Sequence, residues 1–194
     1  MTDVKKDWIA EIGLLIYTAC QLSAVYGLTD LFRIAGEWVD SGNPRQVRVT
    51  HWRAEEGGEP ICVWDTHPNK PHHLDYVITP PSIVMPDKMQ PMPQEAAWLR
   101  SQYKGGSRVC SICAGAFVLA ESGLLQGRRV TTHWAFAKHL AQSYEDIEVA
   151  DRNLVLDDGD VISAGGILAW TDLGLTLVER LFGRSTMLST ARFL

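Results

Sequence analysis

The stretch Arg108-Val-Cys-Ser-Ile-Cys-Ala-Gly-Ala-Phe-Val-Leu-Ala120 changes within two residues from an apolar strand pattern to an apolar helix pattern. Cys113 stands at that junction, with the small residues Ser111 and Gly115 two positions to either side. This spacing matches Gly-x-Ser-x-Gly with cysteine at the centre, and it predicts a nucleophile elbow. Because the side chain would lie at the amino end of the new helix, we expect its thiol to lose a proton readily.

Apolar strand patterns and amphipathic helix patterns alternate along the rest of the chain. Such alternation predicts an α/β fold with a mostly parallel sheet and helices on both faces. The proline-rich stretch 80–93 fits neither a helix nor an inner strand and is predicted to be a long functional loop. The predicted strands are 12–17, 47–52, 61–64, 74–79, 107–112, 128–131, one near 147, 154–156 and 161–163; the predicted helices are 23–39, 94–103, 114–122, 134–142 and 167–181.

Length and composition favour one domain. The chain has 194 residues, of which 46% are hydrophobic, and we assign 1–10 to an N-terminal tail and 11–194 to the domain. A net charge of −5 without a basic block argues against nucleic-acid binding by this chain alone. No apolar run approaches a membrane span or a signal core, so we expect a cytoplasmic protein with reduced cysteines.

His133 is the first candidate partner of the elbow cysteine. It follows the predicted strand 128–131, which we expect beside the strand that carries Cys113, so a Cys113-His133 contact is predicted. An imidazole next to a thiol can take its proton or stabilise the thiolate. Asp172, near the start of the last predicted helix, could orient the histidine. The alternative is a buried thiol with an unrelated histidine.

Two other cysteine and histidine patterns compete with this interpretation. Cys110 and Cys113 match Cys-x-x-Cys, but an extended strand would separate their Cα atoms by roughly 9 to 10 Å, too far for a disulfide. His51, His67, His72 and His73 with Cys62 suggest a metal, but adjacent histidines in a strand point to opposite faces. We therefore predict no metal site, no cofactor, and surface histidines beside a loop.

The run from Val109 to Ala120, followed by Ser122-Gly-Leu-Leu-Gln-Gly-Arg-Arg-Val-Thr-Thr-His-Trp134, resembles the ThiJ/PfpI superfamily, whose members are class-I glutamine-amidotransferase-like. The segments 154–166 and 172–178 extend the resemblance to nearly the whole chain from about Glu11. It implies a flavodoxin-like three-layer sandwich with a nucleophile elbow. Within the superfamily, the sequence of residues 120–134 looks most like that of the ligand-sensing N-terminal domain of AraC-type transcriptional regulators. Isocyanide hydratases are the nearest enzymatic relatives by this resemblance.

By that resemblance Cys113 and His133 take the catalytic positions, but two positions depart from the enzymes. The carboxylate that serves as acid and base falls on Ala24, which cannot shuttle a proton. The Pro-Gly-Gly that offers backbone donors falls on Pro80-Pro-Ser82, and Pro81 has no N–H. Losing one such donor costs about a hundredfold or more in rate, so a conventional cysteine hydrolase or hydratase is disfavoured.

We therefore expect a small-molecule sensor without catalysis, with one effector pocket at the carboxyl ends of the parallel strands. DNA would be bound only through a helix-turn-helix domain expected to follow this chain, and a homodimer is expected because such regulators commonly work as pairs. A cysteine-dependent enzyme, an oxidisable redox cysteine and a structural remnant stay open. The predicted pocket residues are Ala24, Pro81, Ser82, Cys113, Ala114, His133, Trp134 and Asp172.

Overall fold

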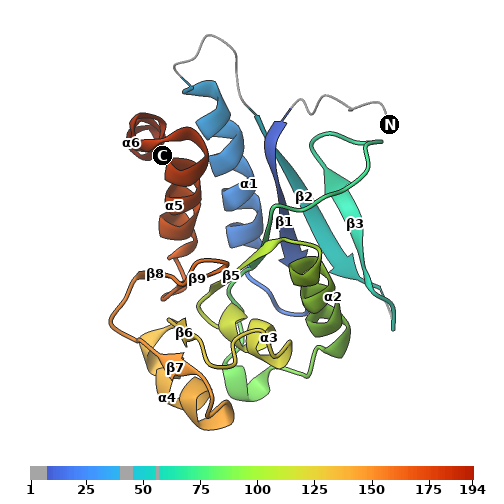
Figure 1. Ribbon diagram of the computed structural model, residues 1–194, viewed down its shortest axis with the longest axis vertical. Coiled ribbons are helices and arrows are strands. Elements are labelled where there is room, and N and C mark those ends of the chain that lie inside the picture. The colour runs from blue at the N-terminus through green and yellow to red at the C-terminus, as the bar shows by residue number, and fades with distance from the viewer. Residues whose placement is uncertain (1–7, 40–45, 56) are drawn as a thin grey trace.

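The computed structural model describes residues 8–39, 46–55 and 57–194 (Figure 1). Strands and helices alternate along these residues, as the sequence predicts. In chain order they are β1 (Trp8–Ile16), α1 (Leu22–Glu37), β2 (Gln46–Ala54), β3 (Pro60–Asp65), β4 (Tyr76–Thr79), the 3-10 turn η1 (Pro86–Lys88), α2 (Pro93–Lys104), β5 (Arg108–Ile112), α3 (Gly115–Glu121), β6 (Arg129–Val130), α4 (Trp134–Ser143), β7 (Glu148–Val149), β8 (Val155–Asp157), β9 (Val161–Ala164), α5 (Trp170–Phe182) and α6 (Arg184–Phe193).

The larger sheet has seven strands in the order β3-β2-β1-β4-β5-β9-β8. Strands β2, β1, β4, β5 and β9 are parallel, whereas β3 and β8 run antiparallel at the two edges. The predicted mostly parallel sheet is confirmed, and β2 and β3 form an antiparallel pair at one edge. The parallel strands end together at the carboxyl edge, which is the lower end of the sheet in Figure 1.

Helices cover both faces of this sheet. Helices α1, α5 and α6 pack against one another on one face, and α2 packs with α3 on the other (Figure 1). Helix α1 buries Leu28, Leu31 and Phe32, which have no exposed surface and recur at helical spacing, and the first two lie against Gly174 of α5. The three-layer α/β sandwich is therefore confirmed. None of the described helices is long and apolar enough to cross a membrane.

Three expectations about the elements are wrong. Strand β1 begins at Trp8, so residues 8–10 belong to the sheet and not to a tail. Strand β6 pairs with β7 in a separate two-stranded sheet, whereas the elbow strand β5 lies between β4 and β9. Helix α6 has no counterpart among the predicted helices, because its buried positions are Thr186 and Thr190 and no apolar period marks it.

Candidate functional site at the carboxyl edge

Cys113 forms the predicted elbow between β5 and α3. Its φ is 55°, in the left-handed region that side chains other than glycine rarely adopt. The backbone holds it there from both sides: its N–H donates to the Ala164 carbonyl (2.8 Å), and its carbonyl accepts from the Thr132 hydroxyl (2.7 Å). A strained conformation fixed in this way aims one side chain away from both elements.

Gly115 explains why strand and helix can approach so closely after the elbow. A Cβ at this position would lie 2.4 Å from the Thr79 oxygen and 2.5 Å from the Pro80 oxygen. Both atoms are backbone, so neither can move aside without displacing the end of β4. The small residue that the sequence places two positions after Cys113 is therefore required by close approach.

The expected activation of the Cys113 thiol is wrong. Only 2% of the residue is exposed, and burial raises the pKa of the thiol to about 11. The backbone N–H groups of Ala114 and Gly166 favour the thiolate, but they only partly offset the burial. The loss of hydration therefore outweighs the helix terminus, and the thiol is protonated at neutral pH.

His133 does not form the predicted pair with Cys113. Among the described residues it makes no hydrogen bond to Cys113 or to Asp172, although the hydroxyl of the preceding Thr132 donates to the Cys113 carbonyl. Its Nδ1 instead accepts the Ala135 N–H (3.2 Å) and so caps α4. Because Nδ1 accepts this hydrogen bond, the neutral ring carries its proton on Nε2.

Asp172 lies in the first turn of α5, where a negative charge interacts favourably with the helix dipole. Its Oδ2 accepts a hydrogen bond from the neighbouring Thr171 hydroxyl (3.3 Å). The carboxylate thus serves its own helix end, and among the described residues no hydrogen bond joins it to His133.

The positions that depart from the enzymes are occupied by packing residues. Ala24 has no exposed surface and belongs to the buried face of α1. Ser82 forms an isolated antiparallel bridge with Cys20, and the Pro81 carbonyl accepts the Gln21 N–H (2.6 Å). Segment 80–82 is therefore tied to the loop after β1, and its carbonyl groups are engaged with that loop.

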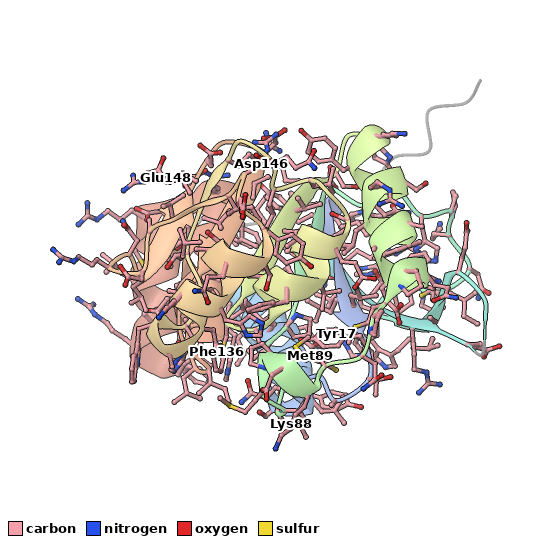
Figure 2. All side chains as sticks on the ribbon, turned by 90° about the horizontal axis from the view of Figure 1, so that it is seen from below. Tyr17, Lys88, Met89, Phe136, Asp146 and Glu148 are labelled. Carbon is pink, nitrogen blue, oxygen red and sulfur yellow. The ribbon has the colours of Figure 1, made fainter. Side chains whose placement is uncertain are left out.

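Tyr17 is a residue of this region that sequence reasoning missed. It is 3% exposed, and its hydroxyl donates to the Pro80 carbonyl (2.6 Å). Burial raises its pKa well above the usual value, and negative charge on Cys20 and then on Cys113 would raise it further. The last apolar residue of a strand pattern carries no signal of such a contact. Figure 2 views the molecule from the carboxyl edge and labels Tyr17 there.

Two hollows open near the elbow, and Cys113 lines neither of them. The first, of about 340 Å³, includes His133 and the exposed Trp134. It adjoins the elbow, because Thr132 bonds to the Cys113 carbonyl and Gly166 faces its thiol. The second, of about 270 Å³, lies between the proline-rich loop and helices α3 and α4. The residues that line the first are Thr132, His133, Trp134, Asp151, Arg152, Asn153, Leu154, Gly165 and Gly166.

The cysteine and histidine patterns are also resolved. All four cysteines are free, and burial within β5 raises the pKa of Cys110 to about 12. His51 is not a surface histidine as predicted: it is 3% exposed, lies 2.8 Å from the Thr29 hydroxyl, and burial lowers its pKa to about 4. It lies on β2, its ring stacks on that of Trp64, and its side chain is on the buried side of the strand.

The profile of the DJ-1/PfpI family matches residues 57–180, which include the elbow, His133 and β9. The chain belongs to the DJ-1/PfpI family. Its likeness to solved structures supports the flavodoxin-like fold: a putative transcriptional regulator from Vibrio parahaemolyticus superposes with a TM-score of 0.71 at 23% identity, covering 95% of this chain and 98% of that one. An AraC family transcriptional regulator from Pseudomonas putida gives a TM-score of 0.72 at 14% identity, with the same coverage.

Curated relatives of this DJ-1/PfpI chain include both an enzyme and transcriptional regulators. Isonitrile hydratase of Pseudomonas putida is 43% identical over 93 residues, which are 48% of this chain and 40% of the hydratase. The HTH-type transcriptional regulator CdhR of Pseudomonas aeruginosa is 37% identical over 91 residues, 47% of this chain and 27% of the regulator. The matched part is thus less than half of either relative, and the likeness alone does not choose between sensor and enzyme.

Proposed function

We propose that this chain is the small-molecule-sensing domain of an AraC-type transcriptional regulator and that it binds its effector without cysteine catalysis. The observation that carries the proposal is the protonated, buried thiol of Cys113, with a pKa of about 11, in an otherwise intact elbow. A catalytic cysteine needs a thiolate or an adjacent base. Among the described residues no base is hydrogen-bonded to this thiol, and the thiol itself is protonated at neutral pH.

The neighbouring residues support the same conclusion. Ala24 offers no proton, Pro81 offers no N–H, and His133 uses its Nδ1 lone pair to cap α4. The hollow of about 340 Å³ beside the elbow remains as a place for a small molecule. Its exposed Trp134, His133 and Asn153 combine an aromatic face with hydrogen-bonding groups, the usual composition of a ligand site.

Binding of an effector is tested by a calorimetric and thermal-shift screen of small amines and amino-acid derivatives. A ligand of the folded state must raise the melting temperature. We expect Trp134→Ala to weaken binding, because it removes the exposed wall of the hollow, and Cys113→Ala to retain it. Leu188→Ala, on an exposed position of α6, is the matched control for loss of an exposed apolar side chain. Binding that survives Trp134→Ala but disappears in Cys113→Ala would overturn the location.

A cysteine-dependent hydratase or hydrolase is the second candidate, because the positive φ of Cys113 is retained at the elbow. It predicts turnover of isonitriles, esters or amides that Cys113→Ala abolishes. We expect turnover by the unmodified chain to equal that of Cys113→Ala. A rate that depends on the thiol would establish the enzyme and remove the purely sensing role.

A further inference from the structure

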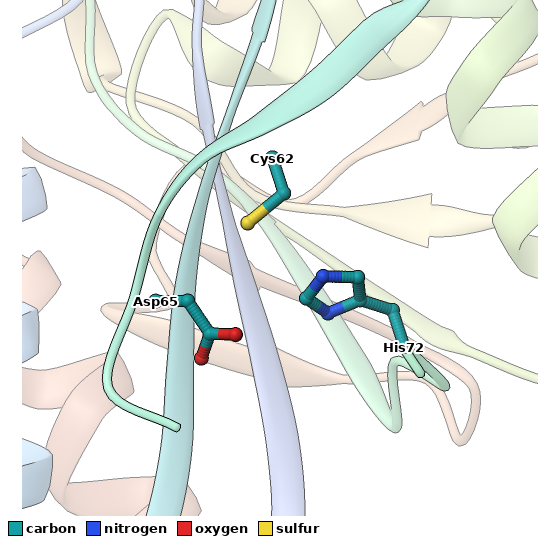
Figure 3. Close-up of side chains that lie close together, drawn as sticks. All are labelled: Cys62, Asp65 and His72. Atoms are coloured by element: carbon teal, nitrogen blue, oxygen red, sulfur yellow. The ribbon is translucent and has the colours of Figure 1, made fainter. Parts of the chain in front are cut away.

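A cluster of polar side chains lies away from the carboxyl edge, where β3 meets the loop 66–75. Cys62, Asp65 and His72 each direct one ligand atom toward the others, and these atoms lie within 4.8 Å of one another (Figure 3). We propose that these three residues form a binding site for Zn²⁺ or a similar borderline divalent cation. Thiolate, imidazole and carboxylate are the ligand types that zinc prefers.

A β-bulge brings Cys62 and Asp65 to the same face of β3. Residues three apart in a regular strand point to opposite faces. Here Asp65 pairs with Thr50 and Cys62 pairs with Trp52, so the register shifts within the hairpin. Thr50 and Trp52 are two apart on β2 and share a face, and the bulge therefore gives their partners the same face.

His72 is oriented for metal binding by a buried carboxylate. Its Nδ1 lies 2.7 Å from Oε1 of Glu11, whose side chain is 1% exposed, and its ring packs edge-on against Trp52 at 5.0 Å. A neutral His72 that donates Nδ1–H to Glu11 presents the Nε2 lone pair to the cluster. Carboxylate-histidine pairs of this kind fix the tautomer and raise the basicity of zinc ligands.

The charges of the cluster, before a metal binds, leave an excess of one negative charge. Arg48, with a side chain that is fully buried, contacts Glu11 (3.2 Å) and Asp65 (2.7 Å), so one positive charge faces two negative charges. A divalent ion that displaces the Cys62 proton would add two positive charges and one negative charge, and would bring the cluster to neutrality. Oδ2 of Asp65 accepts one hydrogen bond, from Arg48, and keeps a lone pair.

The geometry requires only a small adjustment. Ligand atoms at zinc bond lengths of about 2.0 to 2.3 Å in a tetrahedron lie roughly 3.5 Å apart, so the cluster must contract by about 1 Å. His72 is on an exposed loop and Cys62 is on the edge strand, so both can move. Three protein ligands leave one tetrahedral position for water, and the ion would join β3 to the loop 66–75.

The test uses the chelator-treated chain with Zn²⁺ alone, titrated in competition with a chromophoric chelator, and with Co²⁺ as a spectroscopic probe. We expect one ion per chain, a thiolate-to-cobalt charge-transfer band, and a higher melting temperature with Zn²⁺. Cys62→Ser should abolish the band. Cys62→Ser and His72→Gln should each weaken Zn²⁺ binding by about tenfold or more, since even outer-shell partners have effects of that size.

His73→Gln is the matched control, because it removes the adjacent exposed histidine, which lies outside the cluster. Circular dichroism of each variant establishes folding, and Cys62→Ala replaces Cys62→Ser if the latter is unfolded. No binding, binding without the charge-transfer band, or equal loss in His73→Gln and His72→Gln would overturn the site. In that case His72 and Glu11 form only a hydrogen bond.

Discussion

The elbow and the hairpin cluster, made of Glu11, Arg48, Cys62, Asp65 and His72, are two polar regions with opposite electrostatics. At the elbow, burial raises the pKa of Cys113 to about 11 because no charged side chain compensates it. In the hairpin cluster, burial alone would raise the pKa of Asp65, but hydrogen bonds from Arg48 hold it below its usual value. Burial therefore decides the charge of a group only where its partners are neutral.

The largest expected effect comes from breaking the hairpin cluster. Arg48→Met leaves Glu11 and Asp65 buried without their cation, so we expect the free energy of unfolding to fall by about 3 to 5 kcal/mol. Urea denaturation followed by circular dichroism measures it. Arg129→Met is the control, because its ion pair with Glu148 is exposed and should be worth less than about 1 kcal/mol. Equal losses in the two variants would mean that Arg48 is not needed to balance buried charge.

The second prediction concerns the packing of the elbow. Gly115→Ala places a Cβ against the backbone oxygens of Thr79 and Pro80, so we expect a loss of about 3 kcal/mol in the same denaturation experiment. Gly58→Ala is the control, because the nearest atom to its Cβ, the Glu55 oxygen, lies 3.7 Å away. A stability of Gly115→Ala within error of Gly58→Ala would show that β4 and α3 are not held at this distance.

These two sites show what the sequence can predict. The elbow follows from local pattern, because an apolar strand, a small residue and an apolar helix succeed one another over 108–120. The hairpin cluster does not, because it depends on a register shift in β3 and on a contact between Glu11 and His72, far apart in sequence. The sequence also predicts the wrong direction for the pKa of the Cys113 thiol, for a similar reason. The helix terminus beside the thiol is a local feature, but the burial of Cys113 is a property of the whole fold.

His51 extends the comparison to a buried histidine without a charged partner. Its pKa of about 4 in the folded chain lies below the unfolded value, so the unfolded chain binds the proton first as the pH falls. Stability is lost from about pH 6.5 toward pH 4, and we expect about 2 kcal/mol by pH 4.5. His51→Gln, which keeps a partner for Thr29, should lose less over this range. The same pH dependence in His51→Gln and the unmodified chain would contradict the assignment.

The smallest effect is expected at Cys113 itself. Its folded pKa of about 11 exceeds the unfolded value, so the unfolded chain releases the thiol proton first as the pH rises. Stability should therefore fall above about pH 9, by about 1 kcal/mol at pH 10. Cys113→Ala removes this contribution, and the difference between the two pH profiles isolates it from Cys110 and Tyr17, which also titrate high.

Alkylation provides an independent measurement of the same thiol. At pH 8 a buried, protonated Cys113 should react with iodoacetamide far more slowly than an exposed cysteine, because the thiolate is the nucleophile. Cys62, which is partly exposed, is the internal reference, and peptide mass spectrometry distinguishes the two sites. Faster labelling of Cys113 than of Cys62 would require a charged partner at the elbow. The elbow would then resemble the hairpin cluster, where a charged partner offsets the effect of burial.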